Sequence, residues 1–137
     1  MIPPFHKTIK VLASLPAATP QQLRAVKNKF PDIPDEYIRL MSQATEIELG
    51  LPNDRYLRIW EPGGCIDMDE GYSISRSMPD AIPIGDDGGG RVIFYAVGSN
   101  GFGLYRVGFG VLDLEGATWI APNLEALLYR GVGIDRI

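Results

Sequence analysis

The chain has 137 residues, 45% of them hydrophobic and 22% charged, and its formal net charge is −4. This size and composition predict one domain, spanning residues 1–137, with a single hydrophobic core. No apolar run approaches the roughly 20 residues that a membrane-spanning helix needs. The apolar run at residues 11–15 ends at Pro16, too early for a secretory signal. We therefore expect a cytoplasmic protein that does not associate with a membrane.

Residue types that bind metals or form disulfides are scarce. Cys65 is the only cysteine, which excludes an internal disulfide and is typical of a reducing compartment. His6 is the only histidine, and no CxxC pair accompanies it, so a zinc site is not expected. The sequence therefore predicts neither a bound metal nor another cofactor.

Two helices are predicted before the first strand. Residues 1–18 are rich in Pro and Ala and are expected to form an extended segment over the surface. Thr19 and Pro20 are a favourable helix start, and apolar residues at helical spacing continue to Phe30. A second helix is expected from residues 32–34 to about Thr45, with Tyr37 on its buried face.

From residue 46 the hydrophobic period changes from helical to alternating, which predicts strands. Residues 47–51 and 56–60 flank the turn Pro52-Asn53-Asp54 and are expected to form an antiparallel hairpin. Pro62-Gly63-Gly64 is interpreted as a further break. Residues 65–78 fit no period and are interpreted as a short helix or helical turns within a long connection.

The second half of the chain predicts an antiparallel meander followed by a helix. Asn100-Gly101 is a strong hairpin signal, because both residues tolerate positive φ. The last helix is expected to open at 121–123, with Gly131 at its C-terminal cap. The predicted strands are 82–84, 92–97, 102–107, 111–114 and 117–120. The aromatic residues expected in the core or on a half-buried sheet face are Trp60, Phe94, Phe102, Tyr105 and Trp119.

This order of elements predicts an α+β fold. An antiparallel sheet of about six strands would be covered by two N-terminal helices and one C-terminal helix.

Acidic residues are concentrated in one part of the chain. Residues 61–87 contain one basic and seven acidic residues, a net charge of −6, whereas residues 1–60 carry +2 and residues 88–137 carry zero. Clustered negative charge repels nucleic acid and attracts basic partners. The alternative is a solvated loop face without a binding role. The acids of this segment are Glu61, Asp67, Asp69, Glu70, Asp80, Asp86 and Asp87.

The acidic segment ends in a glycine-rich loop between two apolar runs, within the stretch IPIGDDGGGRVIFY at residues 82–95. We expect a strand, a tight loop and a second strand, with at least one of Gly88, Gly89 and Gly90 at positive φ. Asp86 and Asp87 are expected to hydrogen-bond the loop's own backbone. Arg91 and Arg106 are candidate ion-pair partners for these aspartates.

Three stretches of the chain, in this order, resemble motifs of the SUKH superfamily. They are Ile33-Pro34-Asp35-Glu36-Tyr37, Ile84-Gly85-Asp86-Asp87-Gly88-Gly89-Gly90 and Ile120-Ala121-Pro122-Asn123-Leu124-Glu125. This family includes bacterial immunity proteins against polymorphic toxins and fungal regulators of cell-wall synthesis. The resemblance spans most of the chain and implies the α+β fold predicted above. Ala44-Thr45, where relatives often show Asn-Gly, and the acidic 61–71 stretch depart from the family pattern.

Three functional classes remain open. The first, implied by the resemblance, is a non-catalytic immunity protein that neutralises a toxin, for example a nuclease, by stoichiometric binding to its basic surface. The second is a small enzyme that uses Asp86 and Asp87, although adjacent side chains in extended structure point to opposite faces. The third is a ligand site in the glycine loop, although neither GxxxxGK[ST] nor GxGxxG occurs there.

The candidate site residues follow from the first class. The partner-binding candidates are Asp67, Asp69, Glu70, Asp80, Asp86 and Asp87. Gly85, Gly88, Gly89 and Gly90 are expected to shape the loop. No catalytic or metal-binding residue is predicted.

Overall fold

The computed structural model describes residues 4–137, and within them a sheet of seven antiparallel strands forms the centre of the fold. The strands lie across the sheet in chain order, so each pairs with its neighbours in sequence. They are β1 (Lys10–Leu15), β2 (Thr45–Leu51), β3 (Arg55–Ile59), β4 (Ile82–Asp86), β5 (Arg91–Gly98), β6 (Gly101–Gly108) and β7 (Thr118–Ala121). With the helices they form the α+β fold that the sequence predicts.

The N-terminal segment, expected to be extended over the surface, contains a strand that the sequence does not predict. Lys10–Leu15 pair with β2 as an edge strand of the sheet, and residues 1–3 lie outside the described residues. All six residues of β1 are exposed. The alternation of buried and solvated residues that identifies a half-buried strand is therefore missing from its sequence.

The described helices are α1 (Pro20–Lys29), α2 (Asp35–Met41), α3 (Pro62–Tyr72), α4 (Ile74–Ser77) and α5 (Leu124–Tyr129). The predicted start of α1 is confirmed by a reciprocal cap. The Thr19 hydroxyl accepts from the Gln22 N–H at 3.2 Å, and Gln22 Oε1 accepts from the Thr19 N–H at 2.8 Å. This arrangement satisfies two backbone donors that a helix start otherwise leaves free. Helix α2 is shorter than predicted, because β2 begins at Thr45.

The segment around residues 61–78 is more helical than its sequence indicates. Pro62 occupies the first position of α3, where its missing N–H is not needed, so Pro62-Gly63-Gly64 begins a helix instead of interrupting the chain. Ser73 adopts φ 55° and separates α3 from α4. The two helices are joined by Asp69, whose carboxylate accepts from the N–H and the hydroxyl of Ser75 at 2.7 and 2.8 Å.

Residues 111–114 do not form the strand that their apolar character predicts. The chain turns after Gly108, and Leu114–Gly116 form a 3-10 turn capped by Asp113. Phe109 leaves the sheet and packs between Trp60 and Tyr72, with ring centroids 6.4 and 4.5 Å away. This aromatic contact draws the segment away from β6, and β7 pairs with β6 instead.

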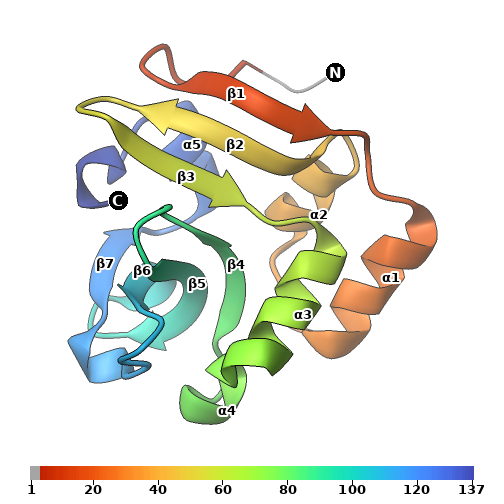
Figure 1. The fold of residues 1–137 in the computed structure, drawn as a ribbon, viewed down its shortest axis with the longest axis vertical. Helices are drawn as coiled ribbons and strands as arrows, with labels where there is room; N and C mark the ends of the chain where they lie inside the picture. Colours follow the sequence, from red (N-terminus) through yellow and green to blue (C-terminus); the bar gives the residue numbers. More distant parts are fainter. Residues whose placement is uncertain (1–3) are drawn as a thin grey trace.

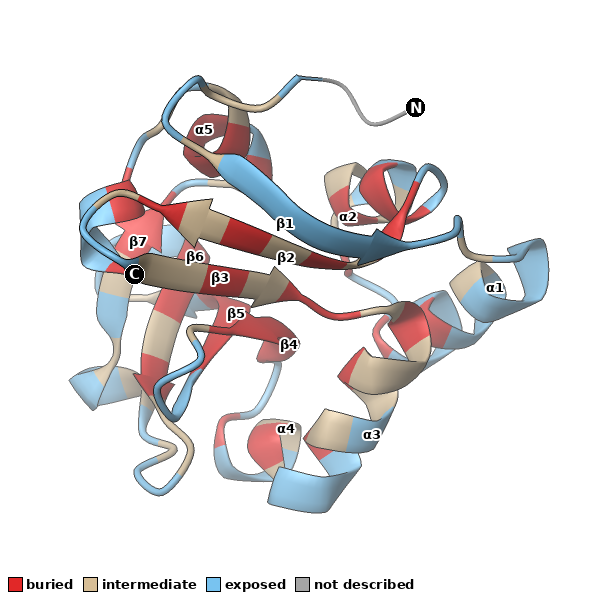
Figure 2. Ribbon diagram, turned by 45° about the horizontal axis from the view of Figure 1, so that its top comes forward, coloured by how far each residue is buried: buried red, intermediate tan, exposed pale blue. Residues whose placement is uncertain are grey.

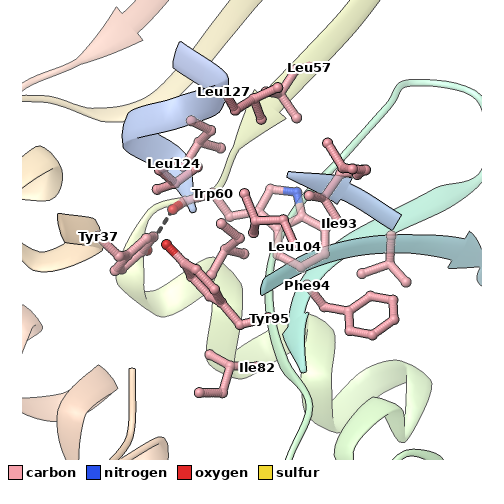
Figure 3. Close-up of a cluster of buried hydrophobic side chains, with 14 of the residues drawn as sticks. Tyr37, Leu57, Trp60, Ile82, Ile93, Phe94, Tyr95, Leu104, Leu124 and Leu127 are labelled. Atoms are coloured by element: carbon pink, nitrogen blue, oxygen red, sulfur yellow. Dashed lines mark hydrogen bonds between the residues drawn. The ribbon is translucent and has the colours of Figure 1, made fainter. Parts of the chain in front are cut away.

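Aromatic side chains from several elements meet in the core (Figure 3). Tyr37 of α2 donates from its hydroxyl to the Trp60 carbonyl at 2.7 Å. Burial raises the pKa of Tyr37 well above its ordinary value. Of the aromatic residues predicted for the core, Trp60, Phe94 and Tyr105 are buried, Trp119 is half-buried and Phe102 is exposed.

The helices leave one face of the sheet open near β2 and β3. Figure 1 shows α5 behind these strands, and α1 packed beside α3, which with α4 forms the connection from β3 to β4. Helices α3 and α4 contact β4, and β4 is buried along its whole length. Along β2 and most of β3, by contrast, buried and half-buried residues alternate (Figure 2). The loop between β4 and β5 reaches this open face.

Candidate functional site

The loop between β4 and β5 is organised by the carboxylate of Asp87. Oδ1 accepts hydrogen bonds from the N–H groups of Gly89 at 2.8 Å and Arg91 at 3.1 Å. Aspartate commonly stabilises tight turns in this way. Gly88 and Gly90 adopt φ 74° and 91°, which confirms the prediction that at least one of the three consecutive glycines takes positive φ.

Two glycines allow close approaches between the loop region and β3. A Cβ atom at Gly85 would lie 2.2 Å from the backbone oxygen of Arg58, and one at Gly88 would lie 2.7 Å from the ring of Tyr56. Both distances are shorter than van der Waals contact allows. The absence of a side chain at these two positions therefore lets β4 pair with β3 and lets the loop rest on Tyr56.

Asp86 is buried and bound by two side chains from the end of β3. Arg58 donates from Nε to Oδ1 at 3.1 Å and from Nη2 to Oδ2 at 3.3 Å, and Trp60 Nε1 lies 3.3 Å from Oδ1. A two-point guanidinium–carboxylate contact is a strong, directional pair. The hydrogen bond to Asp86 raises the pKa of Arg58. Asp86 therefore joins β3 to β4 and presents little carboxylate surface to a partner.

Of the two arginines predicted to pair with the loop aspartates, one does so. Arg91 Nε lies 3.6 Å from Asp87 Oδ2, as the sequence suggested. Arg106 instead donates to the carbonyl of Arg136 near the C-terminus. The partner of Asp86 is Arg58, which is distant in sequence but directly opposite it in the β3–β4 register.

The acids predicted on residues 67–80 differ in exposure. Asp69 is only 3% exposed, and besides Ser75 it lies 3.6 Å from Lys29 Nζ. Its carboxylate closes the α3–α4 junction, so Asp69 presents little charge at the surface, in contrast to the expectation from the sequence. Asp67, Glu70 and Asp80 are exposed.

Five of the six predicted binding residues fall into two separate groups, and the sixth, Asp67, is exposed on α3. Asp69 and Glu70 border one hollow beside Lys29, and Asp80 borders another next to it. Asp86 and Asp87 belong to the glycine loop and the open face of β3. The acidic segment of the sequence is therefore not one continuous surface.

A shallow hollow of about 560 Å³ lies where the glycine loop meets the open face of β2 and β3. It is lined by Glu48, Asp54, Tyr56, Arg58, Asp87, Gly88 and Gly89. Tyr56 donates from its hydroxyl to Glu48 Oε1 at 2.6 Å. Burial, reinforced by this hydrogen bond, raises the pKa of Tyr56 to about 12. Carboxylates from β2, the β2–β3 turn and the loop therefore surround one aromatic ring, and Arg58 is already paired with Asp86.

Glu46, at the start of β2, is held in an unusual backbone conformation. Its φ of 46° is positive, which costs a non-glycine residue roughly 1–2 kcal/mol. The β1–β2 register is irregular in the same region, as expected for a bulge. Burial raises the pKa of Glu46, nearby Glu61 and Asp86 act in the same direction, and Arg58 opposes them. Glu46 is therefore a poorly neutralised carboxylate at one end of the open face.

Neither the cysteine nor the histidine of the chain lines the hollow. Cys65 is buried against the Tyr37 hydroxyl, and burial raises the pKa of its thiol to about 12, so it is a thiol at neutral pH. His6 is bound to Thr8. Within residues 4–137, no three His, Cys, Asp or Glu side chains come together as a metal site.

None of the helices in the described part of the chain is both long and apolar enough to cross a membrane.

Sequence reasoning missed the residues that β2 and β3 contribute to the hollow. Glu48, Tyr56 and Arg58 occupy alternate positions of the predicted hairpin, facing away from its buried residues. Placing the turn at residues 52–54 sets Glu48 opposite Arg58. This pairing was therefore accessible from the sequence, whereas the contact between Gly88 and Tyr56 depends on tertiary structure.

Comparison with models of known protein families finds no match to this chain, and comparison with curated proteins finds none either.

Proposed function

We propose that this protein is a non-catalytic binding module, and most concretely an immunity protein that neutralises a toxin by occupying a basic surface. The toxin as partner is drawn from the SUKH resemblance of three sequence motifs. The binding chemistry is drawn from the hollow beside the glycine loop. The mechanism is one-to-one occlusion, with charge complementarity accelerating the encounter.

The observation that carries this proposal is the arrangement of carboxylates over a preformed surface. Glu48 and Asp54 border the hollow, where Asp87 already binds Arg91 and two backbone N–H groups and Arg58 already has Asp86 as its partner. The loop is held by hydrogen bonds that its own backbone N–H groups donate to Asp87, so little ordering entropy is lost when a partner binds. A lysine or arginine side chain of the partner would find carboxylates and the face of Tyr56, an arrangement that favours cations.

The bonding of the two loop aspartates argues against the enzyme alternative. A general base needs an available lone pair directed at substrate. Both oxygens of Asp86 bind Arg58, and Oδ1 of Asp87 binds two backbone N–H groups. These contacts support a structural role for the two aspartates.

The proposal predicts that a toxin gene lies beside the gene for this chain and that co-expression of the two protects cells. The sharper test is the association rate of the purified pair at several salt concentrations. Glu48→Gln with Asp54→Asn removes two charges and keeps the acceptor for Tyr56. Asparagine also tolerates the positive φ of Asp54, which is 59°. We expect association at low salt to slow by roughly tenfold and to depend less on salt.

A matched control removes the same charge from the other acidic group. Asp67→Asn with Glu70→Gln changes two exposed residues of α3 and is expected to alter the rate by less than about twofold. If the α3 pair slows association and the hollow pair does not, α3 is the contact surface and the hollow is not. Substrate turnover by the isolated protein, lost in Asp86→Asn, would instead favour an enzyme.

A further inference from the structure

The turn between β5 and β6 brings together an exposed Asn-Gly pair and a buried tyrosine, neither of which belongs to the hollow. Ser99 and Asn100 form the turn, and Gly98 pairs with Gly101 where the two strands meet it. Gly101 takes φ 83°, a conformation that favours glycine. The hairpin therefore needs a glycine directly after Asn100, and no other asparagine of the chain precedes a glycine.

An asparagine that precedes glycine is chemically labile. The glycine nitrogen gives its proton to a water or hydroxide base and attacks Cγ of the asparagine side chain, the side-chain nitrogen leaves as ammonia, and a succinimide ring forms. Water then opens the ring at either carbonyl and gives aspartate or isoaspartate. Asn100 and Gly101 are exposed. The Ser99 hydroxyl donates to Asn100 Oδ1 at 3.2 Å, which polarises the carbon that is attacked.

Tyr105 holds the chain on both sides of the labile peptide bond. Its hydroxyl accepts from the Asn100 N–H at 3.0 Å and donates to the Gly101 carbonyl at 2.7 Å. The ring is fully buried, and a Cβ atom at Gly98 would lie 2.6 Å from it. Trp119 packs edge-on against the same ring, with centroids 5.3 Å apart. Because the ring is fixed from these sides, its hydroxyl cannot follow the turn when the turn opens.

We propose that Asn100 is a deamidation site of this protein and that the Tyr105 hydroxyl sets the rate of deamidation in the folded state. Ring closure requires the Gly101 nitrogen to turn toward the Asn100 side chain. This movement pulls Gly101 out of its pairing with Gly98 and away from the hydroxyl that holds it. The reaction therefore proceeds only when the turn opens, a local event that does not require the core of the sheet to unfold.

The two products change the turn differently. Aspartate adds one negative charge and leaves the backbone as it was. Isoaspartate places the side-chain methylene carbon in the backbone, so the turn no longer closes the Gly98–Gly101 pair. Val97 and Phe102, the next pair along the hairpin, are 69% and 50% exposed. The buried part of the two strands begins beyond them, so the disruption is expected to stay at the tip of the hairpin.

Peptide mapping by mass spectrometry, after incubation of the folded protein at mildly alkaline pH, measures the conversion of each asparagine. Asn53 is the internal control, because it also lies in an exposed turn but precedes Asp54. We expect Asn100 to convert faster than Asn53 in the folded protein. We also expect Asn100 to convert more slowly there than in the same chain unfolded in urea, where Tyr105 no longer holds the turn.

Tyr105→Phe tests the role of the hydroxyl. It removes both hydrogen bonds to the turn, so the turn opens more often and conversion of Asn100 should accelerate by about tenfold. Tyr95→Phe is the matched control. It removes the hydroxyl of another buried tyrosine, which points to the opposite face of the sheet and donates to Glu36, and it should leave the rate at Asn100 unchanged. Faster conversion of Asn53 than of Asn100, an unchanged rate in Tyr105→Phe, or equal acceleration by the two variants would overturn the proposal.

Discussion

Glu36 joins three elements of the fold, and its replacement gives the most direct test of how the helices are attached to the sheet. Its Oε2 accepts from the Tyr95 hydroxyl at 2.6 Å and from the Leu124 N–H at 2.7 Å, and Oε1 accepts from the Glu125 N–H at 3.1 Å. The Glu36 carboxylate of α2 therefore binds a side chain of β5 and the first two backbone N–H groups of α5. Asn123 accepts from the next donor, Ala126 N–H, at 2.8 Å.

The cost of removing Glu36 can be worked out from these contacts. A hydrogen bond to a charged group contributes about 1.5–3 kcal/mol, but Glu36 is half-buried, so the lower end of that range applies. Three such bonds, with the favourable position of a negative charge at a helix N-terminus, give about 4 kcal/mol for Glu36→Ala. Glu36→Gln keeps one acceptor oxygen but turns an N–H group toward other donors, so we expect about 2 kcal/mol.

Thermal and urea unfolding at neutral pH measure both variants. At about 3–4 °C per kcal/mol for a chain of this size, the melting temperature should fall by roughly 12 °C for Glu36→Ala and by about half as much for Glu36→Gln. Glu125→Ala is the control, because its ion pair with Arg130 is exposed and should contribute less than about 1 kcal/mol. If the melting temperature of Glu36→Ala lies within about 1 °C of the wild type, the carboxylate does not hold α5 in place.

Two further variants test the loop and the open face. Gly88→Val places a branched side chain at φ 74° and against the Tyr56 ring, and should cost more than about 2 kcal/mol. Gly89→Ala is the control, because a Cβ atom there would meet only the Asp87 carboxylate, 3.5 Å away. Equal melting temperatures for Gly88→Val and Gly89→Ala would contradict this account. Burial raises the pKa of Glu46 in the folded protein above its value in the unfolded chain. Ionisation of Glu46 therefore destabilises the fold as pH rises from the unfolded pKa through the folded pKa. Glu46→Gln should therefore match the wild type below about pH 4 and melt at a higher temperature at pH 7; a difference that does not change with pH would rule this out.

Elements specified by local chemistry could be predicted from the sequence. Thr19 and Pro20 fix the start of α1 through contacts within one turn, and the three consecutive glycines signal their own backbone conformation. Gly131 follows α5 with φ 73°, as the predicted C-terminal cap requires. In each case the interacting groups lie within a few residues, so sequence spacing determines the geometry.

Elements specified by distant contacts could not be predicted in this way. Helix α3 begins with proline and two glycines and is held by packing against α1 and β4, contacts that leave no periodic pattern. Residues 111–114 have strand-like composition, but the docking of Phe109 on Trp60 removes them from the sheet. Asp69 was assigned to the surface because charge density along the chain does not show which carboxylates are buried against Ser75 and Lys29.

The same distinction applies to the site itself. The sequence identifies the glycine loop and the charge of Asp86 and Asp87, but not Arg58 as the partner of Asp86. It also gives no sign that the loop rests on Tyr56, because that contact joins residues 32 positions apart through the β3–β4 pairing. The hollow exists only once the β2–β3 hairpin and the loop are assembled.

The three stretches that resemble SUKH motifs are linked to the rest of the core, and two of them directly to each other. Glu36 of the first stretch binds the backbone of Leu124 in the third. Tyr37 of the first binds the Trp60 carbonyl, and the Trp60 N–H donates to the carbonyl of Ile84 in the second, at 2.8 Å. Most of these motif residues thus build the scaffold, whereas Glu48, Asp54 and Tyr56 lie outside the motifs and line the hollow. In a binding protein, this separation lets surface residues change with the partner while the contacts that hold the sheet and helices together stay the same. The resemblance therefore concerns the fold most directly, and under the proposed binding function the choice of partner would depend on residues that the motifs do not include.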